Sequence, residues 1–152
     1  MATKADNDSR TIAHKLVTFL FSFYFLYYIF AVILVGGFHV GWSELGRFPY
    51  RISEHEFNPA LGGGALGSWL AMVLTFIASF GLAFWVVRAT RKTWDYLLTT
   101  SLVHFIICCG ANRSFPVNWV WWVTLGVANI LVAGLSEVLI YQLREQRDIE
   151  LG

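Results

Sequence analysis

Charge is scarce in this chain of 152 residues. Asp, Glu, Lys and Arg together make up 14% of it, and the formal net charge is +1. A chain without a strong excess of one sign lacks the field that attracts nucleic acid, so we expect no nucleic-acid partner. Apolar residues make up 57% and aromatic residues 17%, more than an ordinary soluble domain contains. This composition favours a single domain that lies in a lipid bilayer.

Cysteine is almost absent as well. Cys108 and Cys109 are neighbours in sequence, and neighbouring side chains on a helix point in different directions, so we predict packed thiols and no disulfide framework. The chain also lacks a His-Glu-x-x-His motif, a nucleophile elbow and a phosphate-binding glycine loop. The run Glu54-His55-Glu56 contains metal-capable groups but has no second ligand cluster. We therefore predict no enzyme, no metal site and no cofactor.

What the chain does contain is long apolar runs. Each is close to the length of about 20 residues that a helix needs to cross a bilayer, and Trp and Tyr flank several of them as in an interfacial belt. We predict an all-α membrane protein, a bundle of four transmembrane helices with spans at about 16–38, 66–87, 94–111 and 119–140. The remaining segments are an arm over 1–15, a loop over 39–65 and a tail over 141–152. We expect the arm to be disordered, because it has no apolar period.

Lys and Arg are distributed unequally between the two sides of this map. Eight lie in the arm, in the tail and in the short connection between the second and third spans. The other three lie in the long loop and in the connection between the third and fourth spans. Basic residues near the ends of spans stay in the cytosol. We therefore predict that the N and C termini are cytosolic and that the loop 39–65 is lumenal.

Three polar side chains lie deep inside the predicted spans. At a rise of about 1.5 Å per residue, Tyr28, His104 and Asn129 all fall roughly 15–20 Å from the cytosolic edge. Polar groups in hydrocarbon need partners, so one hypothesis is an intramembrane polar cluster of these three, with a neutral His104 at its centre. The alternative is three residues that find separate partners.

Glu137 lies nearer the cytosolic end of the fourth span. It continues a stripe through Asn129 and Ala133 at helical spacing, which predicts that Glu137 faces the bundle interior. Asp95, in the first turn of the third span, lies at the same level and would repel it. The candidate counter-charges at that level are Lys15, Arg88 and Arg91. Two interpretations stay open for these charges, a structural ion pair and a partner-binding site formed by Asp95, Glu137, Arg88 and Arg91.

The second half of the chain resembles the SYS-one family of small Golgi trafficking membrane proteins. The ordered residues that carry this likeness are Asp95-Tyr96, His104, Phe115-Pro116, Trp121-Trp122 and Glu137, with Tyr27-Tyr28 in the first span. The segment around Ser22 and the glycine run at 62–64 depart from the family pattern, as in a divergent paralogue.

The resemblance implies a location and a partner. Family members are four-span proteins of the trans-Golgi network membrane that serve as receptors for an Arf-related small GTPase with an acetylated N-terminus. They thereby support golgin recruitment and vesicle-mediated protein transport. Two other functions stay open from the residues themselves. A small transporter or channel subunit could use the midplane cluster, and a structural four-span partner would need no site.

Overall fold

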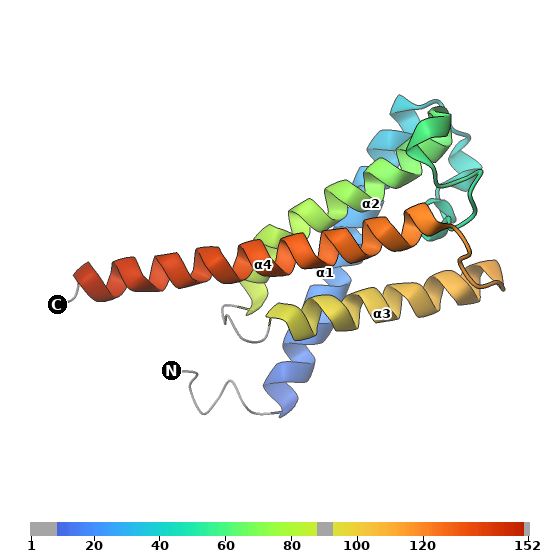
Figure 1. Cartoon of the computed structure of the whole chain (residues 1–152). Coiled ribbons are helices and arrows are strands. Elements are labelled where there is room, and N and C mark those ends of the chain that lie inside the picture. Colours follow the sequence, from blue (N-terminus) through green and yellow to red (C-terminus); the bar gives the residue numbers. More distant parts are fainter. Residues whose placement is uncertain (1–8, 88–92, 151–152) are drawn as a thin grey trace.

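The computed structural model describes residues 9–87 and 93–150, and its regular structure there is entirely helical (Figure 1). The long helices are α1 (Ser9–Gly37), α2 (Gly63–Leu82), α3 (Thr93–Asn112) and α4 (Trp119–Glu150). A π-helical turn, Ala83–Val87, continues α2. Three short 3-10 helices lie between α1 and α2, at Trp42–Glu44, Phe48–Tyr50 and Pro59–Leu61. The ends of α1, α2 and α3 near Gly37, Gly63 and Asn112 define what we call the loop end of the bundle.

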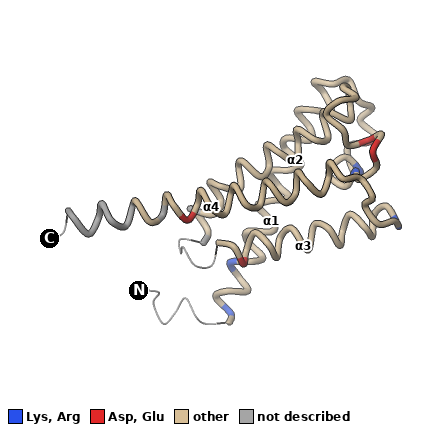
Figure 2. The backbone as a smooth tube through the Cα atoms, viewed as in Figure 1, with Lys and Arg blue, Asp and Glu red and all other residues tan. Residues whose placement is uncertain are grey.

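Four helices in the described part of the chain are long and apolar enough to cross a membrane. Their candidate spans are Ser9–Gly37, Gly63–Leu82, Thr93–Asn112 and Trp119–Leu139. Figure 2 shows that the coloured charges gather toward the ends of these helices, with the middle of the bundle free of them. The predicted all-α, four-span fold is thereby confirmed.

Two helix boundaries differ from the prediction. Helix α1 begins at Ser9, so the second half of the arm is helical rather than disordered. Helix α4 runs to Glu150 and extends past the other helices (Figure 1). No Gly or Pro occurs between Leu135 and Leu151, so nothing in that sequence stops the helix when it leaves the hydrophobic span.

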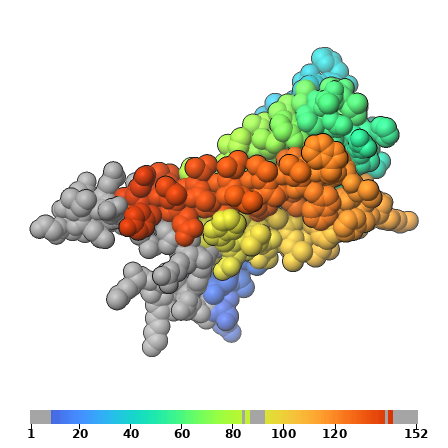
Figure 3. All heavy atoms as spheres, viewed as in Figure 1, coloured from blue at the N-terminus to red at the C-terminus, as the bar shows by residue number. Residues whose placement is uncertain are grey.

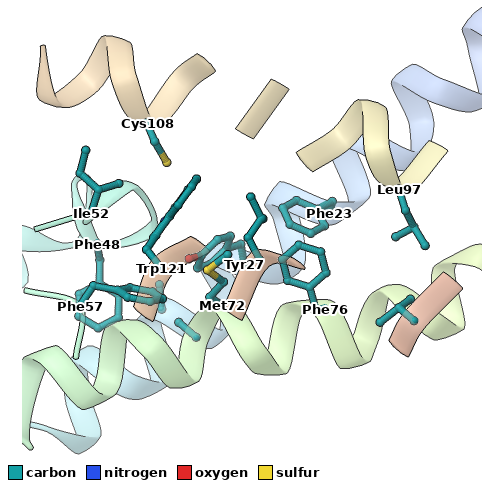
Figure 4. Close-up of a cluster of buried hydrophobic side chains, with 14 of the residues drawn as sticks. Phe23, Tyr27, Phe48, Ile52, Phe57, Met72, Phe76, Leu97, Cys108 and Trp121 are labelled. Atoms are coloured by element: carbon teal, nitrogen blue, oxygen red, sulfur yellow. The ribbon is translucent and has the colours of Figure 1, made fainter. Parts of the chain in front are cut away.

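The interface between α1 and α2 combines large side chains with small ones. Along α1 the buried residues recur at every fourth position, as Phe19, Phe23, Tyr27, Ala31 and Val35. The facing side of α2 is rich in small residues, among them Ala65, Gly67, Ser68, Ala71, Thr75 and Ser79. Because the side chains of α2 are small, the two helices approach closely and the aromatic rings of α1 pack directly against α2. Figure 4 shows Phe23 and Tyr27 close to Met72 and Phe76 of α2.

The segment between α1 and α2 folds back onto the start of α2. A Cβ atom added to Gly67 would lie 3.0 Å from the ring of Phe38 and 3.3 Å from that of Phe48, so any side chain here would press on both rings. Arg51, which belongs to this segment, is almost fully buried. Its guanidinium donates to Ser68 Oγ at 3.3 Å and to Glu44 Oε2 at 3.4 Å, and it lies over the Phe48 ring. The buried charge is thus paired, as burial requires.

Two asparagines fasten the same segment to the connection between α3 and α4. Asn112 Nδ2 donates to the carbonyl oxygen of Tyr50 at 2.6 Å, and Asn118 Nδ2 donates to that of Phe57 at 2.7 Å. Asn118 also caps α4, because its Oδ1 accepts from the backbone N–H of Val120 at 3.0 Å. Each asparagine therefore joins two parts of the chain that are about sixty residues apart, 62 for the first and 61 for the second.

Candidate functional site

His104 lies at the centre of an aromatic enclosure. Its side chain is fully buried, with 0% of its surface exposed. Five rings have their centroids between 5.7 and 6.5 Å from the imidazole, those of Phe23, Tyr24, Tyr27, Tyr50 and Trp121. The Trp121 indole is nearly parallel to the imidazole, at 20°. These rings come from α1, α4 and the segment after α1, so the enclosure joins three parts of the chain.

Both imidazole nitrogens have partners. The Tyr24 hydroxyl lies 3.1 Å from Nδ1, and Cys108 Sγ lies 3.5 Å from Nε2. A neutral imidazole has one donor and one acceptor nitrogen, and a hydroxyl or a thiol can serve either of them. The site therefore satisfies a neutral histidine without a charged partner, as hydrocarbon depth requires.

The predicted cluster of Tyr28, His104 and Asn129 is wrong. Asn129 accepts from Ser101 Oγ at 2.9 Å and donates to the Leu125 carbonyl at 2.8 Å. The Tyr28 hydroxyl lies 3.4 Å from the Gly46 carbonyl oxygen and 3.4 Å from the Tyr50 hydroxyl, and its one proton can be donated to either. The three residues thus have separate partners, which is the alternative interpretation.

The prediction of this cluster compared only the depths of the residues along their helices, and such a comparison assumes that the helices are parallel. Figure 1 shows α1 crossing α3 and α4 steeply, so residues at equal depths along their helices need not meet. The tyrosine beside His104 is Tyr24, one helical turn before Tyr28 on the same face.

Sequence reasoning also missed Tyr50. It lies outside the spans, in the 3-10 helix Phe48–Tyr50, and contacts the His104 ring from there. Burial raises the pKa of its phenol. Tyr50 therefore stays protonated, able to act as both donor and acceptor. The signal that could have found it is the triplet Phe48-Pro49-Tyr50, two aromatic residues around a proline within the loop.

The opposite end of the bundle carries the predicted partner-binding carboxylates, and we call it the Glu137 end. Glu137 itself is exposed rather than inward-facing, which corrects the prediction. The buried stripe of α4 passes through Asn129, Ala133 and Ser136 instead. Ser136 follows Asn129 by seven residues, which nearly complete two helical turns, so both face the core. Glu137 follows Asn129 by eight residues, which exceed two turns by about 80°, so Glu137 faces away from the core.

Glu137 still contacts a neighbouring helix. Its carboxylate accepts one hydrogen bond, from the Trp94 indole of α3 at 3.3 Å. No cation of the described residues pairs with it. An ionised carboxylate has about four acceptor positions, so most of its bonding capacity is unused.

Asp95 lies at the same end, in the first turn of α3, and its side chain is exposed. With Ile12 and Leu16 of α1 and with Thr99, it lines a small hollow of about 130 Å³. A carboxylate in the first turn also complements the dipole of the helix. Arg88 and Arg91, the other two predicted partner-binding residues, lie outside the described residues.

The comparisons with known proteins decide the family. The sequence profile of the SYS1 family, described as "Integral membrane protein S linking to the trans Golgi network", matches residues 2–151. This chain belongs to the SYS1 family. It is a multi-pass membrane protein of the Golgi apparatus, at the trans-Golgi network.

A human relative and the solved structures complete the comparison. The chain is similar to the human protein named putative transmembrane protein 244, with 22% identity over 126 residues. That alignment covers 82% of this chain and 93% of the relative. No solved structure matches this chain significantly.

Proposed function

We propose that this SYS1-family protein is the receptor that recruits an Arf-related small GTPase to the trans-Golgi network, and so supports golgin recruitment and vesicle-mediated transport. The observation that carries the proposal is the pair of exposed carboxylates, Asp95 and Glu137, at one end of the bundle. Both have unused acceptor capacity there. The distribution of Lys and Arg predicts that this end faces the cytosol, where a GTPase would bind.

The hollow beside Asp95 suits a short N-terminal segment. Ile12 and Leu16 provide apolar walls, and the Asp95 carboxylate provides an acceptor. An acetylated N-terminus has lost its charge but keeps amide N–H groups, which a carboxylate accepts as charge-assisted hydrogen bonds. In this proposal Glu137 contacts a second part of the GTPase, and Arg88 and Arg91, which lie outside the described residues, contribute positive charge to the binding.

The described geometry disfavours the transporter alternative. A transport site has to exchange with water on at least one side, and polar residues that line such a path mark it. His104 is fully enclosed by aromatic rings and by Cys108. This enclosure supports a structural role for His104 within the bundle.

Recruitment in cells tests the proposal. Cells that lack the protein would be complemented with the wild type, with Asp95→Asn/Glu137→Gln, or with Glu54→Gln. Glu54 is an exposed carboxylate at the loop end, and it serves as the matched control. We expect the double variant to weaken GTPase binding on the order of tenfold, because Asn and Gln keep an acceptor oxygen but lose the charge that strengthens each hydrogen bond.

The outcomes separate the residue assignment from the function. If the double variant recruits the GTPase as the wild type does, the two carboxylates are not its contact. If deletion of the whole protein leaves the GTPase on the trans-Golgi network, the receptor function itself is wrong.

A further inference from the structure

A groove lies between α3 and α4 within their candidate spans. Figure 3 shows the two helices side by side on one face of the molecule. The groove has a volume of about 460 Å³ and runs from Trp94 past Leu98 to Phe105 along α3, with Trp122 and Gly126 on α4. A Cβ atom added to Gly126 would meet no atom of this chain within 4 Å, so the missing side chain deepens the groove.

The dimensions of the groove suit a single hydrocarbon chain. The eleven helical steps of α3 from Trp94 to Phe105 span about 16 Å, so the 460 Å³ volume corresponds to a mean cross-section of about 30 Å². A helix with side chains is about 10–12 Å wide, which is a cross-section on the order of 80–110 Å². An extended peptide would fit by width, but its backbone N–H and C=O groups would find no partners there.

The polar atoms within the groove are already engaged. Ser101 and Asn129 both line it, and they bond each other at 2.9 Å. The Asn129 amide also donates to Leu125. An occupant of this groove therefore needs no hydrogen-bonding groups of its own, which is the property of an acyl chain.

One end of the groove carries a negative charge. Trp94 lines the groove and also donates to the Glu137 carboxylate, so one side chain joins the apolar channel to the charge. Glu137 lies two residues before the end of the candidate span Trp119–Leu139. A second hollow, of about 490 Å³, is lined by Gly134 and Glu137 and extends beside Tyr141 and Gln142 beyond that span. An acyl chain in the groove would thus lead to a carboxylate at headgroup level, with space beyond it.

We propose that, while no GTPase occupies the Glu137 carboxylate, the α3–α4 groove and Glu137 bind a phospholipid with a primary-ammonium headgroup, its acyl chain in the groove and its ammonium on that carboxylate. An ammonium has three N–H donors for the unused acceptor positions. A choline headgroup has no N–H to donate, and a serine headgroup adds a carboxylate that Glu137 repels. Ethanolamine is therefore the preferred headgroup. Because the surrounding lipid is as apolar as the groove, the headgroup bond supplies the selectivity.

Lipid binding to the purified full-length protein tests this proposal, with no GTPase present. Native mass spectrometry would count dioleoyl phosphatidylethanolamine, phosphatidylcholine and phosphatidylserine retained at increasing lipid concentration. We expect the ethanolamine lipid to bind on the order of tenfold tighter than the choline lipid. Glu137→Gln should bring its affinity down to that of the choline lipid while leaving chain binding intact.

Filling the groove should remove all of these lipids. Gly126→Leu places a side chain where the acyl chain would lie, and Ile130→Trp narrows the groove from an exposed position on the same helix. Gly110→Leu is the control, because that glycine also faces open space but lies outside the groove.

Three results would overturn the proposal. Equal affinity of the wild type for the ethanolamine and choline lipids removes the headgroup assignment. Wild-type lipid binding by both groove-filling variants removes the site. Loss of self-association or of a bound membrane protein in Gly126→Leu, with lipid counts unchanged, assigns the groove to a partner helix instead.

Discussion

Replacing Asn118 should separate two stabilising roles that one side chain performs. Its Oδ1 caps α4, and its Nδ2 donates to the buried Phe57 carbonyl at 2.7 Å. Loss of an N-cap costs about 0.5–2 kcal/mol, and leaving a buried carbonyl unsatisfied costs about 1–3 kcal/mol. Asn118→Ala should therefore lower the free energy of unfolding by about 1.5–5 kcal/mol.

Asn118→Ser isolates the second role. A serine hydroxyl still caps the helix, but it is too short to reproduce the amide bond to Phe57. We expect this variant to lose only the part that fastens the loop, about 1–3 kcal/mol. Ser114→Ala, an exposed change in the same connection, serves as the control and should have little effect.

The assay combines unfolding with local protection. The seven tryptophans provide intrinsic fluorescence for following unfolding in detergent, and limited proteolysis between α1 and α2 reports on the docked segment. Asn118→Ala and Asn118→Ser should both make that segment easier to cleave. If Asn118→Ala matches the wild type in stability and in cleavage, the asparagine does not hold the segment and the reasoning is refuted.

Three further changes test the packing of the bundle by the same unfolding assay. Tyr24→Phe removes the hydroxyl beside His104 Nδ1 and should cost about 1 kcal/mol; no loss would mean that the imidazole is satisfied by other groups. Gly67→Val forces a side chain into two phenylalanine rings and should cost about 1–3 kcal/mol, whereas Gly110→Val, in open space, should be near neutral, so equal effects would contradict the close approach. Ser101→Ala breaks a bond between α3 and α4 and should cost about 0.6 kcal/mol, as measured bonds between membrane helices do on average; a cost above about 2 kcal/mol would show that more than this bond is lost.

The four spans could be predicted from sequence because hydrocarbon imposes one simple demand. A backbone that crosses it must be helical and its side chains predominantly apolar, so length and hydropathy suffice. The helix ends could not be fixed in the same way. Residues 9–15 and those after Leu139 are mostly polar but compatible with a helix. A hydropathy profile detects apolar spans only, so it does not show that the helices continue there.

Side-chain partners depend on how the helices cross, and hydropathy does not contain that information. The face shared by Tyr24 and Tyr28 was recognisable from their spacing, yet which of them reaches His104 depends on the inclination of α1. Tyr50 contacts the histidine because the segment after α1 folds back, which no local pattern in the spans predicts. The exposure of Glu137 could have been obtained from sequence, since the true helical period places Ser136 on the buried stripe.

The most direct test of the receptor proposal is binding in a purified system. The full-length protein would be placed in lipid nanodiscs, and Arf-related GTPases locked in either nucleotide state would be titrated against it. We predict that an N-terminally acetylated GTPase binds the wild type and the Glu54→Gln control equally, and binds Asp95→Asn/Glu137→Gln on the order of tenfold more weakly. Absence of binding to the wild type in both nucleotide states would contradict the account.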